Sequence, residues 1–370
     1  MKRMLNLLLC AALMLSLAAC GRPAEQTPAV SQPSVEETTG PEAAAPEESA
    51  PQETAPEEAA PEAPVSHYPV TVTDHAGREV TIEEEPEKLV SGYYISTSAL
   101  IALGLDEKMV GIEAKANKRA IYRLSAPELI DLPSVGTAKE FDLEGCAALE
   151  PDLVILPMKL KSVVETLESL GIQVLLVNPE NQEQLEGMIS MIATAANVEE
   201  RAETLLGFIA DQEEMLASTL ASVSAPTVYL AGNSNMLSTA GDAMYQSDMI
   251  RLAGGTNVAA EITDTYWVEI DYEQLLAWDP AYIILASDAT YTVEDVLADP
   301  NLADCAAVVN GNVYQMPNKA EAWDSPVPSG ILGAVWLANV LHPDAFTAAD
   351  SNALIDEYYE VFYDFTYSEN

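Results

Sequence analysis

Basic residues are scarce in this sequence. Its 370 residues include 16 lysines and arginines against 59 aspartates and glutamates, which gives a formal net charge of −43. Nucleic acid is therefore excluded as a partner, because binding it requires lysine and arginine clustered over a broad face. The same charge repels anionic lipid, so attachment to a membrane would need a dedicated anchor. Hydrophobic residues still make up 49% of the chain, so it is not a disordered polyanion.

Histidine and cysteine are also few. The three histidines, His67, His75 and His342, are widely separated, and no cluster of histidine and cysteine occurs. First-row metal sites in proteins depend on imidazole or thiolate ligands. We therefore expect no metal site and no resident cofactor, and any metal should arrive already chelated. A bare oxyanion such as molybdate remains an alternative ligand. Cys146 and Cys305 lie in apolar stretches and are expected to be free core thiols.

Sequence motifs of common enzyme classes are missing. The best approach to a hydrolase nucleophile elbow, at residues 232–236, lacks the second glycine that this turn requires. There is also no glycine-rich phosphate-binding loop. The sequence therefore predicts a protein that is not an enzyme. A surface-anchored hydrolase stays as a remote alternative, because carboxylate pairs are too abundant to exclude a glycosidase.

No apolar run is long enough to span a bilayer, but a shorter one stands at the start of the chain. Lys2 and Arg3 precede an apolar stretch over residues 4–16, and small residues lead to Cys20. This pattern predicts a signal peptide over residues 1–19. The ending Leu17-Ala18-Ala19-Cys20 resembles the bacterial lipobox. The resemblance implies that Cys20 carries lipid and holds the protein, outside the cytoplasm, to the outer face of the cell membrane.

Residues 20–65 have the composition of a tether. From residue 21 onward they contain nine prolines, ten glutamates and no aromatic residue, and proline recurs every five residues from Pro41 to Pro61. Such a repeat has no face that could be buried in a core. We expect an extended, self-repelling, disordered linker between the lipid and a folded body.

The folded body reads as an α/β protein. Alternation predicts a β-hairpin over residues 70–73 and 79–82, and short buried runs then alternate with helical patterns, among them one at 98–105. Helices are predicted over 182–197 and 199–222. The fold class expected is two Rossmann-like lobes with central, mostly parallel sheets, joined by a single long α-helix. The N-terminal lobe would span 66–197, the bridging helix 198–223 and the C-terminal lobe 224–370.

Nine short motifs, in order over about 280 residues, carry a family resemblance. They include Asp74-x-x-Gly77-Arg78, Leu149-Glu150-Pro151-Asp152, Ala253-Gly254-Gly255-Thr256-Asn257, and Val309-Asn310-Gly311-Asn312-Val313. With them the body resembles the substrate-binding proteins of ABC importers for ferric siderophores, haem and cobalamin. The resemblance implies a ligand held in a cleft between two lobes, small opening motions, and delivery to the transmembrane permease subunits. It is consistent with a monomer.

The same resemblance gives two glutamates a role. In this family, one surface glutamate on each lobe meets arginines of the permease. Glu144 and Glu273 occupy those motif positions here. The resemblance therefore implies that they orient the protein on its permease.

The distribution of basic residues suggests where the ligand binds. Of the fourteen after the predicted signal peptide, seven lie between residues 115 and 161. The alignment with the motifs of that family implies that the loops at 115–123, 137–140 and 157–161 follow strand ends. Ligands of open α/β sheets bind outside the carboxyl ends of strands. We therefore expect an anionic ligand. The candidates from these loops are Lys118, Arg119, Lys139, Met158 and Lys159.

Aromatic and amide residues complete the predicted site. Tyrosine and tryptophan offer a large contact area at little entropic cost, which suits a metal chelate, although each could serve core packing instead. The candidates are Tyr93, Tyr94, Asn233, Tyr245, Trp267 and Trp323. The sequence thus predicts a lipoprotein receptor for a metal chelate, with a ferric siderophore first. Cobalamin, haem or an oxyanion are the alternatives.

Overall fold

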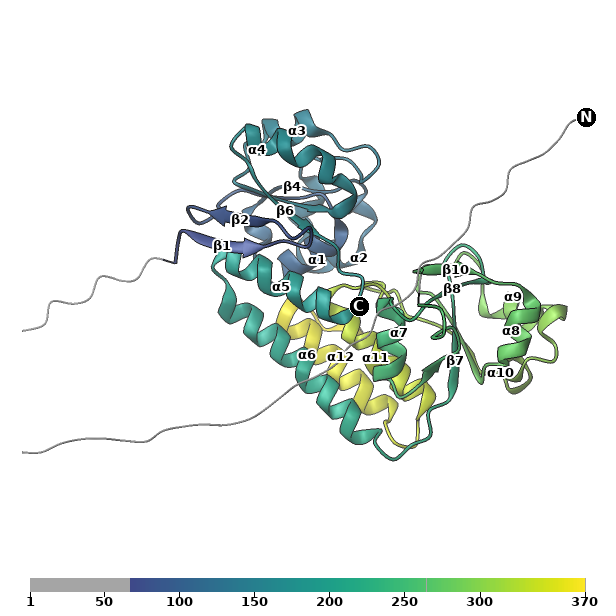
Figure 1. The fold of residues 1–370 in the computed structure, drawn as a ribbon. Helices are drawn as coiled ribbons and strands as arrows, with labels where there is room; N and C mark the ends of the chain where they lie inside the picture. Colours follow the sequence, from purple (N-terminus) through teal and green to yellow (C-terminus); the bar gives the residue numbers. More distant parts are fainter. Residues whose placement is uncertain (1–66, 264, 370) are drawn as a thin grey trace, which may run out of the picture. The chain divides into compact units, whose positions relative to one another are not determined.

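The computed structural model describes residues 67–369 with the exception of residue 264. The predicted signal peptide, Cys20 and the tether lie outside the described residues. The described part contains two four-stranded parallel sheets, each covered by helices (Figure 1). This confirms the predicted fold class of two α/β lobes.

The N-terminal lobe is built on a sheet with the strand order β4-β3-β5-β6. Its strands are β3 (Leu89–Ser91), β4 (Met109–Gly111), β5 (Leu153–Pro157) and β6 (Gln173–Val177). All five residues of β5 are buried, as expected of an aliphatic strand in the middle of a parallel sheet. The helices of this lobe are α1 (Tyr94–Ala102), α2 (Ala120–Ser125), α3 (Leu143–Ala148) and α4 (Val164–Ser169).

Helix α1 begins four residues before the predicted start. Its first turn is rich in hydroxyl groups, which disguise it in the sequence because serine and threonine usually favour turns. Here they have partners in the lobe: Ser91 Oγ lies 2.8 Å from both Ser96 Oγ and Thr97 Oγ1. The helix ends at Ala102, and Gly104 follows with a φ of 71°.

The predicted hairpin is present as β1 (Val70–Thr73) and β2 (Glu79–Ile82), which pair antiparallel. In the turn, Asp74 Oδ1 accepts hydrogen bonds from the backbone N–H groups of Ala76 at 2.9 Å and Arg78 at 3.0 Å. Gly77 supplies the positive φ of 73° that the turn requires. Strand β1 packs beside helix α5 (Gln182–Ala196), as Figure 1 shows.

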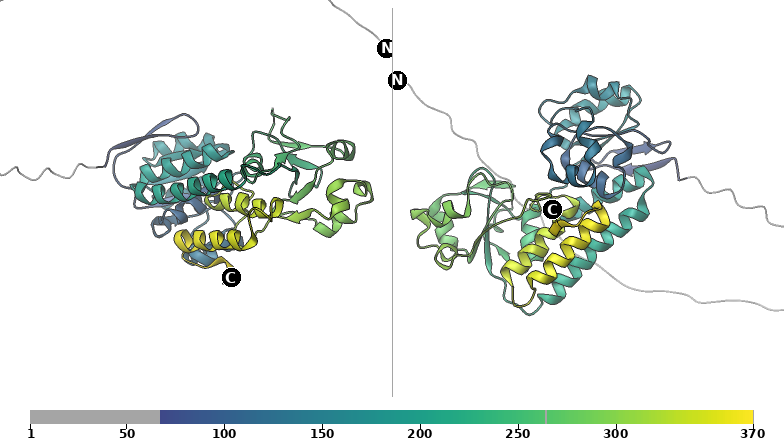
Figure 2. Two further views of the ribbon diagram at one scale, coloured as in Figure 1. Left: turned by 90° about the horizontal axis from the view of Figure 1, so that it is seen from below. Right: turned by 180° about the vertical axis from the view of Figure 1, so that it is seen from behind.

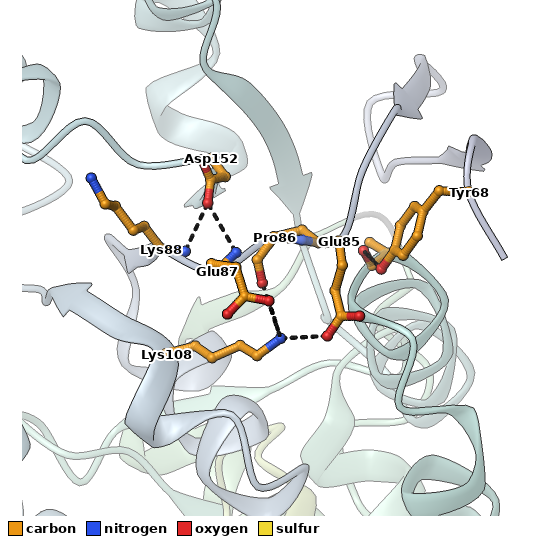
Figure 3. Close-up of polar contacts among 8 residues, drawn as sticks. Tyr68, Glu85, Pro86, Glu87, Lys88, Lys108 and Asp152 are labelled. Carbon is orange, nitrogen blue, oxygen red and sulfur yellow. Dashed lines mark hydrogen bonds and ion pairs between the residues drawn. The ribbon is translucent and has the colours of Figure 1, made fainter. Parts of the chain in front are cut away.

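A polar cluster fixes the connection from this hairpin to the first sheet (Figure 3). The ammonium of Lys108 donates to the Glu85 carboxylate at 2.6 Å and to the Pro86 carbonyl at 3.2 Å. This ion pair lowers the pKa of Glu85. Asp152 Oδ2 accepts the backbone N–H groups of Glu87 and Lys88, both at 2.9 Å. These contacts set where β3 enters the sheet.

The C-terminal lobe repeats the arrangement. Its parallel sheet has the order β12-β11-β7-β9, formed by β7 (Thr227–Ala231), β9 (Thr256–Asn257), β11 (Tyr282–Leu285) and β12 (Val313–Gln315). Strands β8 (Ser238–Ala240) and β10 (Trp267–Glu269) form an antiparallel pair. The helices are α7 (Tyr245–Leu252), α8 (Tyr272–Trp278), α9 (Val293–Leu297), α10 (Ala306–Asn310), α11 (Ile331–Leu341) and α12 (Ala348–Tyr363).

In the sequence, helix α6 (Glu199–Thr219) lies between the strands of the N-terminal sheet and those of the C-terminal sheet. Ala202, Leu205, Ile209 and Leu216 form a buried apolar face of this helix. The helix ends three residues before the predicted position, because Ser222, Ser224 and Pro226 follow and favour irregular backbone. It packs beside α5 and α11, and Figure 2 shows these long helices lying side by side.

Further contacts connect α12 to the N-terminal lobe. The Tyr363 hydroxyl, at the end of α12, donates to the Ser98 carbonyl in α1 at 3.2 Å. Arg201 of α6 donates to the Ala102 carbonyl at 3.0 Å and to the Val361 carbonyl at 2.8 Å. One arginine therefore holds the ends of α1 and α12 against α6, so the lobes are connected by side-chain contacts as well as by the long helix.

Both cysteines of the described body are buried and free, as predicted from their apolar surroundings. Burial raises the pKa of the Cys146 thiol to about 11, so this group is a thiol rather than a reactive thiolate at neutral pH. Across residues 67–369 without residue 264, no helix is both long and apolar enough to cross a bilayer.

Candidate binding pocket

A cavity of about 630 Å³ lies between the two lobes. Its walls come from α1 and the 115–123 segment in the N-terminal lobe, and from Asp288 and residues 318–327 in the C-terminal lobe. These segments follow the carboxyl ends of strands β3, β4, β11 and β12. The cavity therefore occupies the position in which α/β sheets commonly bind ligands, and its volume suits a small organic ligand.

Basic side chains outnumber acidic ones in the lining of this cavity. Five of them line the cavity, namely Lys115, Lys118, Arg119, Arg123 and Lys319. The lining contains two carboxyl groups, on Asp288 and Glu321. In a chain with a net charge of −43, a cavity with a cationic excess is a marked local reversal of charge. Such a cavity attracts anions and concentrates them near its mouth.

Arg119 and Tyr94 form the best-defined contact in the pocket. The guanidinium carbon of Arg119 lies 4.1 Å from the centroid of the Tyr94 ring, which is cation–π geometry. Tyr93 packs edge-to-face on Tyr94 with a centroid distance of 5.3 Å. Burial raises the pKa of Tyr94, so its hydroxyl remains protonated. The aromatic pair thus supports the arginine from one side.

Hydrogen bonds cross from lobe to lobe next to the cavity. The backbone N–H of Ile121 donates to the Ala320 carbonyl at 3.1 Å. The Tyr94 hydroxyl reaches Ser325 Oγ at 3.4 Å. Ser98 in α1 donates to the Glu321 carboxyl group. The basic segment 115–123 is therefore attached directly to the C-terminal lobe.

A second buried carboxyl group, that of Glu113, lies outside the pocket lining. Glu113 accepts hydrogen bonds from Thr97 Oγ1 and from the Tyr122 hydroxyl, both at 2.7 Å. Burial raises the pKa values of Glu113 and of Glu321. Successive residues of α1, Thr97 and Ser98, thus each donate to a buried glutamate.

Three of the residues predicted from the sequence, Tyr94, Lys118 and Arg119, line this pocket. Tyr93 supports it by packing on Tyr94. Five others lie outside its lining, and four of these are exposed: Lys139 and Lys159 in the N-terminal lobe, and Asn233 and Trp267 in the C-terminal lobe. The fifth, Met158, packs on the hydrophobic cluster behind the N-terminal sheet.

The two remaining aromatic candidates are core residues. Trp323 is 1% exposed, and its indole N–H donates to the Tyr359 hydroxyl at 2.8 Å. Tyr245 is 3% exposed at the start of α7. Core packing, which the sequence left open for each aromatic candidate, accounts for the positions of both.

Several pocket residues were not among the predicted ones. Lys115 and Arg123 belonged to the basic stretch that signalled the pocket, and the structure places them with Lys118 and Arg119. Lys319, Ser98 and Glu321 come from other parts of the sequence. Only the pairing of the two lobes brings them to the cavity, and no local pattern signals that.

Glu144 and Glu273 occupy equivalent positions in their lobes. Each is exposed in the first turn of a short helix, α3 or α8. In each, the preceding aspartate caps the helix: Asp142 accepts from the Gly145 N–H and Asp271 from the Gln274 N–H, both at 2.8 Å. The two side chains are therefore presented to solvent on similar, well-fixed turns.

The described residues contain no group of three or more histidine, cysteine, aspartate or glutamate side chains placed to hold a metal ion.

Comparison with known proteins identifies the family. The sequence pattern described as periplasmic binding protein matches residues 89–320, which is more than half of the chain and includes the basic segment. The chain belongs to the periplasmic binding protein family. It is accordingly an extracytoplasmic substrate-binding protein of an ABC importer, and its partners are the permease subunits and a small ligand. Because this is a family of transport proteins, the prediction that the chain is not an enzyme is confirmed.

Similar binding proteins are known from several organisms. The molybdate-binding protein MolA of Haemophilus influenzae is 27% identical over 323 residues, covering 80% of this chain and 91% of MolA. An uncharacterized ABC transporter substrate-binding lipoprotein of Bacillus subtilis, YvrC, is 26% identical over 75% of this chain and 87% of its own. A cobalamin-binding protein of Halobacterium salinarum is 24% identical over 74% of each chain.

The fold agrees with the sequence similarity. The structure of Haemophilus influenzae MolA bound to molybdate superposes with a TM-score of 0.71 at 26% identity, covering 80% of this binding protein and 99% of MolA. The structure of CeuE from Helicobacter pylori with bound Ni(II) gives a TM-score of 0.70 at 23% identity, over 81% of this chain and 98% of CeuE. The latter likeness concerns the fold alone.

Proposed function

We propose that this binding protein captures an anionic metal chelate, with a ferric siderophore as the first candidate, in the basic pocket between its lobes. The observation that carries the proposal is the placement of five cationic side chains around one interlobe cavity in a strongly acidic protein. A chelate with catecholate or carboxylate arms spreads negative charge over a surface large enough to reach several of them. Arg119 on Tyr94 adds a planar group suited to carboxylate or catecholate oxygens.

The size and chemistry of the cavity favour a chelate over a bare ion. At about 630 Å³ the cavity is much larger than one hydrated metal ion needs. The described lining residues include no histidine, cysteine or methionine that could ligate a metal from the protein side. A metal in this pocket would therefore keep the ligands it arrived with. Cobalamin fits less well, because it presents little negative charge to the cationic side chains of the lining.

A molybdate-like oxyanion is the second candidate. It is favoured by the similarity to Haemophilus influenzae MolA, which extends over four-fifths of this chain. Lysine and arginine side chains suit a tetrahedral oxyanion as well as a chelate. A single oxyanion would contact only part of the cavity wall.

A ligand screen on the full chain, solubilised in detergent, separates these candidates. Tryptophan fluorescence and isothermal titration calorimetry would follow the addition of ferric tricatecholate, ferric citrate, molybdate, haem and cobalamin. We expect micromolar or tighter binding of a ferric chelate and no turnover, with the metal-free siderophore as the matched control. Binding of molybdate alone would favour the second candidate. If no anion binds, the proposal is wrong.

We further propose how the receptor is attached and how it docks. Residues 1–19 would be removed as a signal peptide, lipid on Cys20 would anchor the chain, and residues 20–65 would tether it. The N-terminal lobe (66–197), bridging helix (198–223) and C-terminal lobe (224–370) would act as one monomeric receptor. Glu144 and Glu273 would meet basic residues of the permease, which their exposure on equivalent capped turns supports.

A further inference from the structure

Glu321 is one of two acidic residues, with Asp288, in the wall of a pocket that carries five basic side chains. It lines the cavity between the lobes, yet only 9% of it is exposed. It follows strand β12, two residues after Lys319, in the segment that contacts the N-terminal lobe. A carboxyl group at the wall of an anion-binding cavity opposes binding when it is ionised. Its protonation state therefore bears directly on which ligands the pocket accepts.

The partners of Glu321 are neutral hydroxyl groups. Ser98 of α1 donates to Oε1 and Ser329 donates to Oε2. No ion pair involving Glu321 occurs within residues 67–369, residue 264 aside. Removing an ionised carboxylate from water without a paired cation is costly, so burial favours the neutral acid. In agreement, burial raises the pKa of Glu321.

Among the titratable groups that face Glu321, Arg119 is the main source of positive charge. Arg119, on the segment after β4, acts to lower the pKa of Glu321. Helix α12 faces it with Tyr358, Tyr359 and Tyr363, whose pKa values are raised well above normal by burial. These hydroxyl groups are neutral at physiological pH. The ionised form of Glu321 is thus stabilised by the hydrogen bonds from Ser329 and Ser98 and by one cation, Arg119, that also belongs to the ligand pocket.

We propose that Glu321 is a specificity-determining residue that takes up a proton when an anionic ligand binds, so that the pocket captures the anion together with a proton. The proposal rests on the anion-binding function proposed above. A bound anion compensates the charge of Arg119 and adds negative charge across the cavity. Both effects destabilise ionised Glu321. The proton comes from solvent, and the carboxylate becomes a carboxylic acid. The affinity for a neutral ligand is not raised by this protonation.

The direction of the pH dependence follows from linkage. The pKa of Glu321 is higher in the bound state than in the free state, and the free-state value already lies above the ordinary value of 4.5. Between the two values, affinity increases as the pH falls, by up to about tenfold per pH unit for one proton taken up. Affinity decreases as the pH rises through the bound-state value and is constant above it.

Calorimetry on the full chain in detergent tests this inference. Molybdate and ferric tricatecholate would be titrated in pairs of buffers that differ in ionisation enthalpy, across neutral and mildly acidic pH. We expect uptake of up to one proton per bound anion by the unsubstituted protein. Glu321→Gln should remove that uptake and flatten the pH dependence of affinity. Glu113→Gln is the matched control, because Glu113 is also buried and bonded to α1 but lies outside the pocket lining, and it should retain the uptake.

The outcomes separate the inference from the function on which it rests. If Glu321→Gln binds an anion with unchanged proton uptake, or if Glu113→Gln abolishes it, the inference is wrong and anion binding stands. If neither probe binds the unsubstituted protein, the proposed function fails and the inference fails with it. Infrared difference spectra of the unsubstituted protein, labelled with ¹³C-glutamate, cover the case of a variant that does not fold. A carboxylic acid band from glutamate should grow when the probe binds, and its absence would overturn the inference.

Discussion

The guanidinium of Arg119 lies over the ring of Tyr94, 4.1 Å from the ring centroid. Tyr94 opens helix α1 after strand β3, and Arg119 belongs to the segment after strand β4. This contact therefore joins the segments that follow two neighbouring strands, and it lies at the wall of the interlobe cavity. A guanidinium stacked on an aromatic ring keeps its N–H donors around its edge, where they can bind carboxylate, catecholate or other oxygen groups.

The first prediction concerns the shape of this group rather than its charge. Arg119→Lys keeps the positive charge but loses the planar fork and most of the stacking on Tyr94. We expect the affinity for the anionic ligand to fall about tenfold, which corresponds to roughly 1.4 kcal/mol. Isothermal titration measures it. Arg251→Lys is the control, since Arg251 pairs with Asp248 away from the pocket lining, and it should bind normally. Equal affinities for all three proteins would contradict the assignment.

A second prediction concerns the exposed glutamates on α3 and α8. Charge reversal by Glu144→Lys together with Glu273→Lys should abolish uptake of the ligand by cells, because basic permease residues would then meet like charge. Ligand binding by the purified double variant should be unchanged, since both side chains lie outside the pocket lining.

The control for this experiment is a double reversal elsewhere on the surface. Glu203 and Glu214 are exposed on helix α6, so Glu203→Lys with Glu214→Lys makes the same change in net charge. Uptake should persist in that variant. Normal uptake by the Glu144 and Glu273 variant would show that the docking proposal is wrong.

A third prediction concerns the stability of the lobe arrangement. Arg201→Ala leaves the Ala102 and Val361 carbonyls without their charged donor and removes the contact with the Phe362 ring, 5.0 Å away. We expect a loss of about 1–3 kcal/mol in the free energy of unfolding. Urea denaturation would measure it. Lys88→Ala is the matched control. Lys88 Nζ lies 3.8 Å from the Glu150 carboxylate, which is mostly exposed, so loss of this ion pair should lower the free energy of unfolding by less than about 0.5 kcal/mol. Equal stability of the two variants would contradict the role of Arg201.

A fourth prediction concerns the anchor. Cys20→Ala should release the protein from the membrane fraction, because the lipid attached to this thiol would supply the binding energy at roughly 0.8 kcal/mol per buried methylene. Fractionation of cells followed by immunoblotting measures the distribution, with Cys10→Ala as the control that should stay attached. Continued retention of the Cys20 variant would argue against the lipobox.

Local patterns in the sequence predicted the hairpin, the buried strands and the long helices α5 and α6 well, because each pattern depends on residues close together in the sequence. The limits of α1 were harder to predict. Its Ser96 and Thr97 suggest a turn in isolation, and their partners Ser91 and Glu113 become apparent only in the folded lobe.

The pocket was predictable in part for the same reason. Lys118 and Arg119 stand in a cationic stretch of one lobe, so their clustering is visible in the sequence. Lys319 and Glu321 reach the same cavity from more than 190 residues away, through the pairing of two separate sheets. Trp323 shows the same limit of prediction from the sequence. The residues around it in the sequence do not distinguish a tryptophan that lines a cleft from one whose indole N–H donates to Tyr359 in the core.

The most direct test compares two pairs of cations in one titration experiment. Lys118→Ala with Arg119→Ala changes the pocket wall, whereas Lys139→Ala with Lys159→Ala removes the same charge from exposed sites outside it. With ferric tricatecholate as the probe, we expect affinity to fall on the order of a hundredfold for the first pair, about 2.7 kcal/mol, and to stay within a factor of about two for the second. Equal losses, or a larger loss for the second pair, would contradict the claim that an anion binds in this cavity.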